Sequence, residues 1–244
     1  MESSEWFEAW FDTKFYHMLY RHRDEDEARV FIDHLINFLG LDPKRKIQDL
    51  ACGTGRHSIY LNSIGFDVTG LDLSENNINE AKTFENDLLH FELHDMRNVY
   101  KAGEFDAVFN LFTSFGYFEN EADNARVINA VYEGLKPGGI FVLDYLNSKT
   151  ALEQLPGHEI KAIDGFRFEI NKEYKNDRIV KEIHIEKEGR SMSYTESIYP
   201  FTEKELKQML TNAGFQMKSC FGSYGLEKYD PETSDRLIML AQKN

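Results

Sequence analysis

Apolar residues recur along residues 24–150 in two alternating patterns. Short, mostly apolar runs predict buried strands at 47–51, 66–72, 89–93, 107–112 and 140–145. Apolar positions three and four residues apart, with capping residues and glycines at their ends, predict helices at 24–39, 56–64, 74–84 and 122–135. Strands that alternate with helices in this way predict an α/β fold with a right-handed, doubly wound sheet.

The pattern changes after residue 150. Apolar and polar residues alternate strictly at 166–171, 179–186 and 191–199, with turn residues between the runs. We therefore expect an antiparallel β meander inserted in the wound fold. A capping box formed by Thr202 and Glu205 then begins a helix that ends near Gly214. Closing strands at about 215–224 and 236–241 complete the main sheet.

Glycines follow the first predicted strand. Gly53 and Gly55 let the backbone turn tightly before a helix begins at Arg56, and the exposed N–H groups of a helix start favour a bound negative group. The second strand ends at Asp72, about 20 residues further on, where such folds usually place a ligand for ribose hydroxyls. Topology predicts that Asp95 and Asn110, after the next two strands, lie at the same edge of the sheet.

The order of motifs along residues 24–150 is more specific than the glycines. The motifs are Asp49-Leu-Ala-Cys-Gly-Thr-Gly, Gly70-Leu-Asp-Leu-Ser, Asp95-Met-Arg, Phe105-Asp-Ala-Val-Phe-Asn and Leu135-Lys-Pro-Gly-Gly. This series resembles the class I S-adenosylmethionine-dependent methyltransferases. Asp95-Met-Arg and Phe112-Thr-Ser-Phe-Gly-Tyr-Phe are similar to the small-molecule type, including the enzymes that methylate the amine of nucleotide-linked sugars.

The resemblance implies a domain organisation. Residues 1–150 and 200–244 would form the S-adenosylmethionine-binding methyltransferase domain, a Rossmann-like seven-stranded sheet with an antiparallel last strand. Residues 1–23 would be a helical cover over the cofactor. Residues 151–199 would be the inserted meander, acting as a lid or as a dimerisation element; a sheet that only extends the scaffold is the alternative.

The resemblance also implies contacts with S-adenosylmethionine. Asp72 would accept both ribose hydroxyls, and Asp95 would accept the adenine amino group. The other matching positions are Gly53, Gly55, Asn110 and Leu111 beside the methionine half, Leu73 and Met96 against adenine, and Arg56 or Arg23 at the cofactor carboxylate. The arginines have a plain surface role as the alternative.

An aromatic stripe precedes the first helix. Tyr16 and Tyr20 follow several other aromatic residues at helical spacing. In the family, an N-terminal helix closes over the cofactor, and a tyrosine ring there would sit against the sulfonium charge. Packing in the core is the alternative for both tyrosines.

The acceptor would approach from the loop after the fourth strand. The candidate substrate-binding residues are Phe115 and Tyr117 in that loop, with Tyr145 and Asn147 after the fifth strand. Methyl transfer from a sulfonium needs alignment more than a dedicated base, so the catalytic residues stay unknown. His57 and His22 are candidate proton acceptors, since neutral imidazole serves near pH 7.

Composition limits the partners. The chain has 42 acidic and 28 basic residues, a net charge of −14, which argues against nucleic acid as a partner. No apolar run approaches the ~20 residues of a membrane span, and the N-terminus is acidic, without the apolar core of a signal peptide. The two cysteines, Cys52 and Cys220, form no metal or redox motif. These features predict a cytoplasmic protein without a metal.

The sequence thus predicts transfer of a methyl group from S-adenosylmethionine to a nitrogen or oxygen of a small organic acceptor, with nitrogen ahead of oxygen. Methylation of protein or RNA is an alternative, although Asn110-Leu-Phe-Thr lacks the prolines of base-amino methylases. A nicotinamide-dependent oxidoreductase is disfavoured because Ser58 stands in place of the third glycine. A non-catalytic S-adenosylmethionine-binding module and a homodimer stay open.

Overall fold

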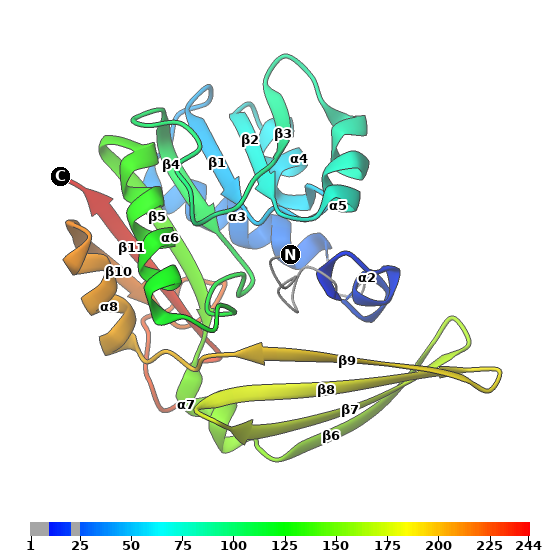
Figure 1. Cartoon of the computed structure of the whole chain (residues 1–244). Helices are drawn as coiled ribbons and strands as arrows, with labels where there is room; N and C mark the ends of the chain where they lie inside the picture. Colours follow the sequence, from blue (N-terminus) through cyan, green and yellow to red (C-terminus); the bar gives the residue numbers. More distant parts are fainter. Residues whose placement is uncertain (1–9, 21–24) are drawn as a thin grey trace.

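Two β-sheets make up the computed structural model, which describes residues 10–20 and 25–244 (Figure 1). The larger sheet has seven strands in the order β10-β11-β5-β4-β1-β2-β3, and the smaller has four in the order β6-β7-β8-β9. The fold class predicted from the sequence, a doubly wound sheet with an inserted antiparallel meander, is confirmed.

The seven-stranded sheet is parallel except at one strand. Its parallel strands in chain order are β1 (Lys46–Leu50), β2 (Asp67–Asp72), β3 (Leu89–Leu93), β4 (Phe105–Asn110) and β5 (Leu135–Leu146). β11 (Arg236–Lys243) lies antiparallel between β5 and β10 (Phe215–Phe221). β1 pairs with both β2 and β4, so the order of the strands reverses there. Such sheets bind ligands outside the carboxyl ends of their strands at this point.

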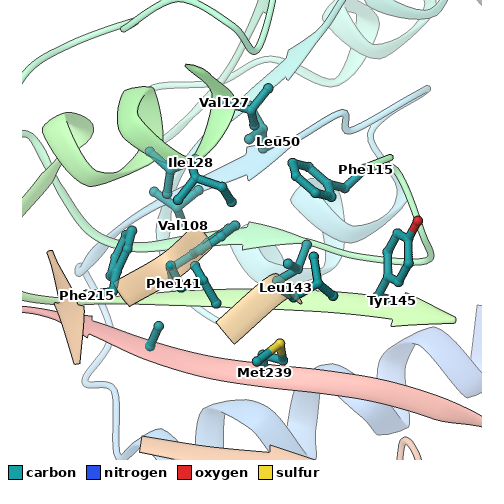
Figure 2. Packing of buried hydrophobic residues seen from close by; sticks show 14 of the residues in the cluster. Leu50, Val108, Phe115, Val127, Ile128, Phe141, Leu143, Tyr145, Phe215 and Met239 are labelled. Atoms are coloured by element: carbon teal, nitrogen blue, oxygen red, sulfur yellow. The ribbon is translucent and has the colours of Figure 1, made fainter. Parts of the chain in front are cut away.

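Helices cover both faces of this sheet. α3 (Glu25–Leu39), α4 (Arg56–Ser63) and α5 (Glu75–Ala81), which continues into the short helix η1 (Lys82–Phe84), pack on one face. α6 (Glu121–Gly134) and α8 (Glu203–Asn212) pack on the other. Figure 2 shows Val127 and Ile128 of α6 beside Leu50 and Val108 of the central strands. Apolar side chains therefore fill the space between the helices and both faces of the sheet.

The four-stranded sheet, called the lid sheet below, comprises β6 (Gly157–Ile163), β7 (Phe166–Lys175), β8 (Arg178–Lys187) and β9 (Arg190–Ile198). It follows the short helix α7 (Ser148–Glu153) and has one strand, β6, that the sequence analysis did not predict. β6 is an edge strand whose residues alternate between half-buried and exposed, so its apolar signal is weak.

Residues 10–20, which include α2 (Lys14–Tyr20), pack on the lid sheet and are called the N-terminal cover below. Trp10, Phe15 and Leu19 form an apolar cluster with side chains of β7 and β8. Figure 1 shows α2 between the lid sheet and the side of the main domain that carries α5. Over the ranges that the structure describes, no helix combines the length and apolar character needed to cross a membrane.

Candidate active site

A pocket, called the strand-end pocket below, opens at the carboxyl ends of β1, β2 and β3. Seven of the predicted site residues line it: Tyr16, Gly53, Asp72, Leu73, Asp95, Met96 and Tyr117. Several other lining residues had no predicted ligand role, among them Phe11, Asn77, His94 and Thr113. His94 directly precedes Asp95 at the end of a strand, so its place in the chain was the available signal.

Backbone groups hold Asp72 in the floor of this pocket. Its Oδ2 accepts a hydrogen bond from the Gly53 N–H at 2.8 Å, and its Oδ1 accepts one from the Ser74 N–H at 2.9 Å. Burial raises the pKa of Asp72 above its ordinary value, although these two N–H groups oppose the shift. A carboxylate offers about four acceptor positions. The Asn77 side chain also hydrogen-bonds to Asp72, and the carboxylate keeps acceptor capacity for a ligand hydroxyl.

A second carboxylate lies at the end of β3. Asp95 accepts hydrogen bonds from the Arg97 side chain, the shortest at 2.7 Å from Nη2, and one from the Arg97 backbone N–H at 2.9 Å. Burial pushes the pKa of Asp95 upward, but the hydrogen bonds from Arg97 outweigh it, and the pKa is lowered. Asp95 is therefore an ionised acceptor, with Leu73 and Met96 as apolar neighbours in the lining.

The glycine turn reaches the pocket at only one of its two glycines. Gly53 has a φ of +58°, and nothing lies within 4 Å of where a Cβ would point. Gly55 begins α4 with a φ of +87°, and a Cβ on it would come within 2.6 Å of the Phe91 ring. Gly55 does not line the pocket; glycine is required there for packing.

Three other predicted cofactor contacts are also absent from the pocket lining. Asn110 is buried, and its Nδ2 donates to the Leu50 carbonyl at 2.9 Å. Leu111 is buried in the apolar core. The Arg56 guanidinium lies 5.0 Å from the centre of the Phe112 ring. The side chains of Asn110 and Leu111 are thus buried in the fold beneath the pocket lining.

The structure places most of the predicted substrate residues away from the pockets. Phe115 and Tyr145 are buried in the core (Figure 2), and the Tyr145 hydroxyl donates to the Tyr199 carbonyl. Asn147 caps α7 and donates from Nδ2 to the carbonyls of Pro231 and Ser234 at 3.0 and 2.8 Å. None of the three lines either pocket. Of the four predicted substrate residues, only Tyr117 does.

Of the two histidine candidates, only His57 lies within the described residues. His57 is buried and stacks on Phe112 at 5.0 Å between ring centres. Burial, and then the charge of Arg56, lower the pKa of His57 to about 3, and it lines neither pocket. His22 and Arg23 lie outside the described residues.

A second pocket, the lid pocket, lies between the lid sheet and the main domain. Thr113 and Tyr117 line both pockets, so the two are neighbours. The remaining polar lining comes from Tyr20, Lys172, Lys181, Glu196 and Arg236. Tyr20, predicted as a cofactor contact, thus lies in this pocket. The residues of the lid sheet that line this pocket were not predicted from the sequence. Strand alternation shows which residues share one face of a sheet, but it does not show which other part of the protein packs against that face.

A buried ion pair shapes the junction of the two pockets. Asp144 is fully buried and accepts from Arg236 at Nε (2.9 Å) and Nη2 (2.7 Å). It also accepts from the Phe112 N–H at 2.7 Å, while Arg236 Nη2 donates to the Thr113 Oγ1 at 2.7 Å. Phe112 and Thr113 have φ values of +57° and +60°, a conformation that costs non-glycine residues energy. The pair therefore holds a strained loop at the junction.

The strand-end pocket fits the adenosine part of S-adenosylmethionine. Asp72 presents an anchored carboxylate suited to a pair of ribose hydroxyls. Leu73 and Met96 offer apolar surface for a flat ring, and Asp95 offers an acceptor for an amino group. The open space above Gly53 admits the rest of such a ligand close to the backbone.

Comparison with known proteins shows the family of this chain. The sequence pattern of the methyltransferase domain family matches residues 20–219. The glycine/sarcosine N-methyltransferase of Parasynechococcus marenigrum is 30% identical to this chain over 223 residues. The alignment covers 86% of this chain and 76% of that enzyme.

Two solved structures show the same fold at lower identity. An S-adenosylmethionine-dependent methyltransferase from Clostridium acetobutylicum has a TM-score of 0.78 at 19% identity, covering 93% of this chain and 94% of its own. The sugar N-methyltransferase KedS8 from Streptoalloteichus has a TM-score of 0.74 at 22% identity, covering 94% and 92%. By its fold, its strand-end pocket and the match over residues 20–219, the chain belongs to the S-adenosylmethionine-dependent methyltransferases.

Proposed function

We propose that this enzyme transfers the methyl group of S-adenosylmethionine to a nitrogen, or less preferably an oxygen, of a small organic acceptor that enters the lid pocket. The observation that carries the proposal is the shared wall of the two pockets. Thr113 and Tyr117 line both, so a ligand in each would meet at these side chains. In-line displacement needs this arrangement, with the donor on one side and the nucleophile on the other.

In this proposal, the residues of the strand-end pocket hold the cofactor. Asp72 accepts the ribose hydroxyls, Asp95 accepts the adenine amino group, and Leu73 and Met96 pack against the ring. Tyr16 lies on the wall that the N-terminal cover contributes, where a tyrosine ring favours a nearby sulfonium charge. The bound cofactor supplies a methyl group that is already activated by this charge.

The protein contributes alignment and the exclusion of water. The N-terminal cover closes one side of the strand-end pocket, and the lid sheet closes one side of the lid pocket. Orientation of this kind supplies roughly 7–11 kcal/mol in well-aligned reactions. An amine attacks the methyl group in its neutral form, after its ammonium form has lost a proton to solvent, and the methylated ammonium product can release its proton to solvent in turn. The proposal therefore assigns no catalytic proton acceptor.

Two observations favour nitrogen as the methylated atom: the activities for which two similar proteins are named, and the charged residues that line the lid pocket. The P. marenigrum relative is named for methylation of glycine and sarcosine, and KedS8 for methylation of a sugar nitrogen. Lys181 and Glu196 place opposite charges on the wall of the lid pocket, which suits a polar, small acceptor. The net charge of −14 disfavours RNA. A protein acceptor has no specific observation in its favour.

Replacing Ile179 by tryptophan tests the position of the acceptor. Ile179 lines the lid pocket but not the strand-end pocket, so the larger side chain should fill the acceptor space. We expect calorimetric binding of S-adenosylmethionine within about twofold of wild type. Methyl transfer to a panel of glycine, sarcosine and an amino-sugar nucleotide should fall by about 100-fold or more for whichever acceptor wild type uses, since misplacement by about 1 Å already costs this much.

The matched control is Val180→Trp. Strand alternation puts Val180 on the opposite face of the lid sheet from Ile179, so this variant should keep both cofactor binding and turnover. Equal turnover by Ile179→Trp and wild type would place the acceptor elsewhere. Tight binding of S-adenosylmethionine by wild type, with no transfer to any amine or hydroxyl compound, would favour the non-catalytic binding module instead.

A further inference from the structure

The N-terminal cover belongs structurally to the lid sheet. Trp10, Phe15 and Leu19 are buried in one cluster with side chains of β7 and β8. The Trp10 ring lies 4.6 Å from the Tyr194 ring on β9, measured between centres. This apolar contact joins two segments more than a hundred residues apart in the chain.

The opposite side of the cover faces the strand-end pocket. Phe11 and Tyr16 line that pocket, and their rings pack edge to face at 4.9 Å between centres. Asp12 bonds the start of α5, accepting from the Ser74 hydroxyl at 2.5 Å and from the Asn76 Nδ2 at 2.6 Å. Ser74 lies two residues after Asp72. The cover is therefore a bridge between the lid sheet and the floor of the pocket.

One lid carboxylate gathers the polar groups of this bridge. Glu196 on β9 accepts from the Trp10 Nε1 at 2.7 Å and from the Tyr20 hydroxyl at 2.8 Å. Lys181 forms an ion pair with it at 3.3 Å and donates to the Tyr20 hydroxyl. The side chains of Lys181 and Glu196 are only 14% and 15% exposed. Water therefore screens this cluster weakly, and its hydrogen bonds are of the stronger, charge-assisted kind.

We propose that Glu196 is a positioning residue that fastens the N-terminal cover over the bound cofactor and thereby sets how long the cofactor stays. It holds both ends of the cover, Trp10 and Tyr20, while the residues between them form the wall of the strand-end pocket. The cofactor leaves faster when that wall is released. The proposal rests on the proposed function, since it takes the strand-end pocket as the cofactor site.

Glu196 also faces the lid pocket. The same carboxylate therefore fastens the cover and borders the space proposed for the acceptor. A group in that pocket that bonds Glu196, Lys181 or Tyr20 changes the fastening directly. The cofactor's residence time is thereby linked to occupation of the acceptor side.

The test compares Glu196→Gln with wild type, using the demethylated product S-adenosylhomocysteine as the probe. Tritium-labelled S-adenosylhomocysteine is bound and then chased with an excess of unlabelled ligand. The glutamine keeps the size of the side chain but removes the charge and one acceptor oxygen. We expect dissociation to be about tenfold faster, with the association rate changed by less than about threefold, because such effects fall mainly on dissociation.

Two further variants separate this role from general stability. Glu182→Gln is the matched control: Glu182 lies on β8 and, by alternation, on the opposite face of the lid sheet from Lys181. It should leave dissociation within about twofold. Tyr20→Phe removes a single hydroxyl and should speed dissociation in the same direction as Glu196→Gln, even if the latter proves too unstable to measure. Thermal unfolding of each variant is recorded in parallel.

The outcomes are distinct. Faster dissociation from Glu196→Gln and Tyr20→Phe, but not from Glu182→Gln, supports the fastening role. Binding by all variants with wild-type dissociation rates overturns it and leaves the proposed function standing. Failure of wild type to bind either S-adenosylmethionine or S-adenosylhomocysteine overturns both.

Discussion

Replacing Asp72 by asparagine is expected to weaken binding of S-adenosylmethionine and of its demethylated product by at least about 100-fold. The amide keeps the shape of the side chain but loses its charge and one acceptor oxygen. Asp72 would receive two ribose hydroxyls, and each charge-assisted hydrogen bond is worth about 1.5–3 kcal/mol. The amide also puts N–H donors opposite the N–H groups of Gly53 or Ser74. Isothermal titration calorimetry measures the change directly.

The matched control is Asp67→Asn at the other end of β2. Asp67 lies at the start of the strand, away from the ligand-binding edge, so binding should stay within about twofold.

Burial raises the pKa of Asp72, so acidification neutralises this carboxylate at a higher pH than for an ordinary aspartate. Cofactor affinity of wild type should therefore fall as the pH drops through that raised pKa, and the asparagine variant should lack this dependence. Unchanged affinity in Asp72→Asn would remove the assignment of the pocket.

The second large effect concerns stability. Arg236→Met should lower the free energy of unfolding by about 3–5 kcal/mol, the usual consequence of breaking a buried ion pair at one partner. Asp144 is fully buried and would then be left without its guanidinium. Thr113 would also lose its hydrogen bond from Arg236, so the strained loop at the junction would loosen. Urea denaturation measures the loss.

The double variant Arg236→Met/Asp144→Asn supplies the control. The asparagine removes the uncompensated charge but still offers an oxygen to the Phe112 N–H, so it should restore much of the lost stability.

The stability lost in Arg236→Met should depend on pH with a defined sign. Burial already raises the pKa of Asp144, and loss of Arg236 raises it further. A folded-state pKa above the unfolded one means that the penalty is present at high pH and shrinks as the pH falls. A loss below about 1 kcal/mol, or one independent of pH, would contradict this interpretation.

The sequence predicted the elements of the main sheet well where local signals agree. The third predicted strand, 89–93, coincides with β3, and the capping box of Thr202 and Glu205 begins α8 as expected. The fifth strand begins earlier than predicted, at Leu135, which pairs with Phe105 of β4. Pro137 and the two glycines suggest a turn before the strand, but they lie inside it, where its register on β4 shifts. A pairing of this kind depends on a partner strand, which local residue preferences do not contain.

The strand-end pocket was more predictable than the lid pocket for the same reason. Asp72 and Asp95 follow parallel strands, so topology alone places them at one edge. Phe115 follows β4 and Tyr145 lies near the end of β5, but both side chains are buried in the core. Gly116, where a Cβ would lie 2.3 Å from the Tyr145 hydroxyl, shows how closely these segments pack. The direction of a side chain in such a loop depends on contacts with distant residues, and no local pattern records them.

The residues of the lid sheet that line the lid pocket lie in one continuous stretch of chain. Lys172, Ile179, Lys181, Glu196 and Ile198 all come from β7, β8 and β9. Under the proposed function, exchange of this stretch during evolution would alter the choice of acceptor and leave the residues of the strand-end pocket unchanged. Because Trp10, Phe15 and Leu19 pack on the same sheet, a changed lid sheet requires matching changes in the N-terminal cover. Residues 10–20 and 157–198 should thus diverge together among relatives, as one module encoded in two pieces.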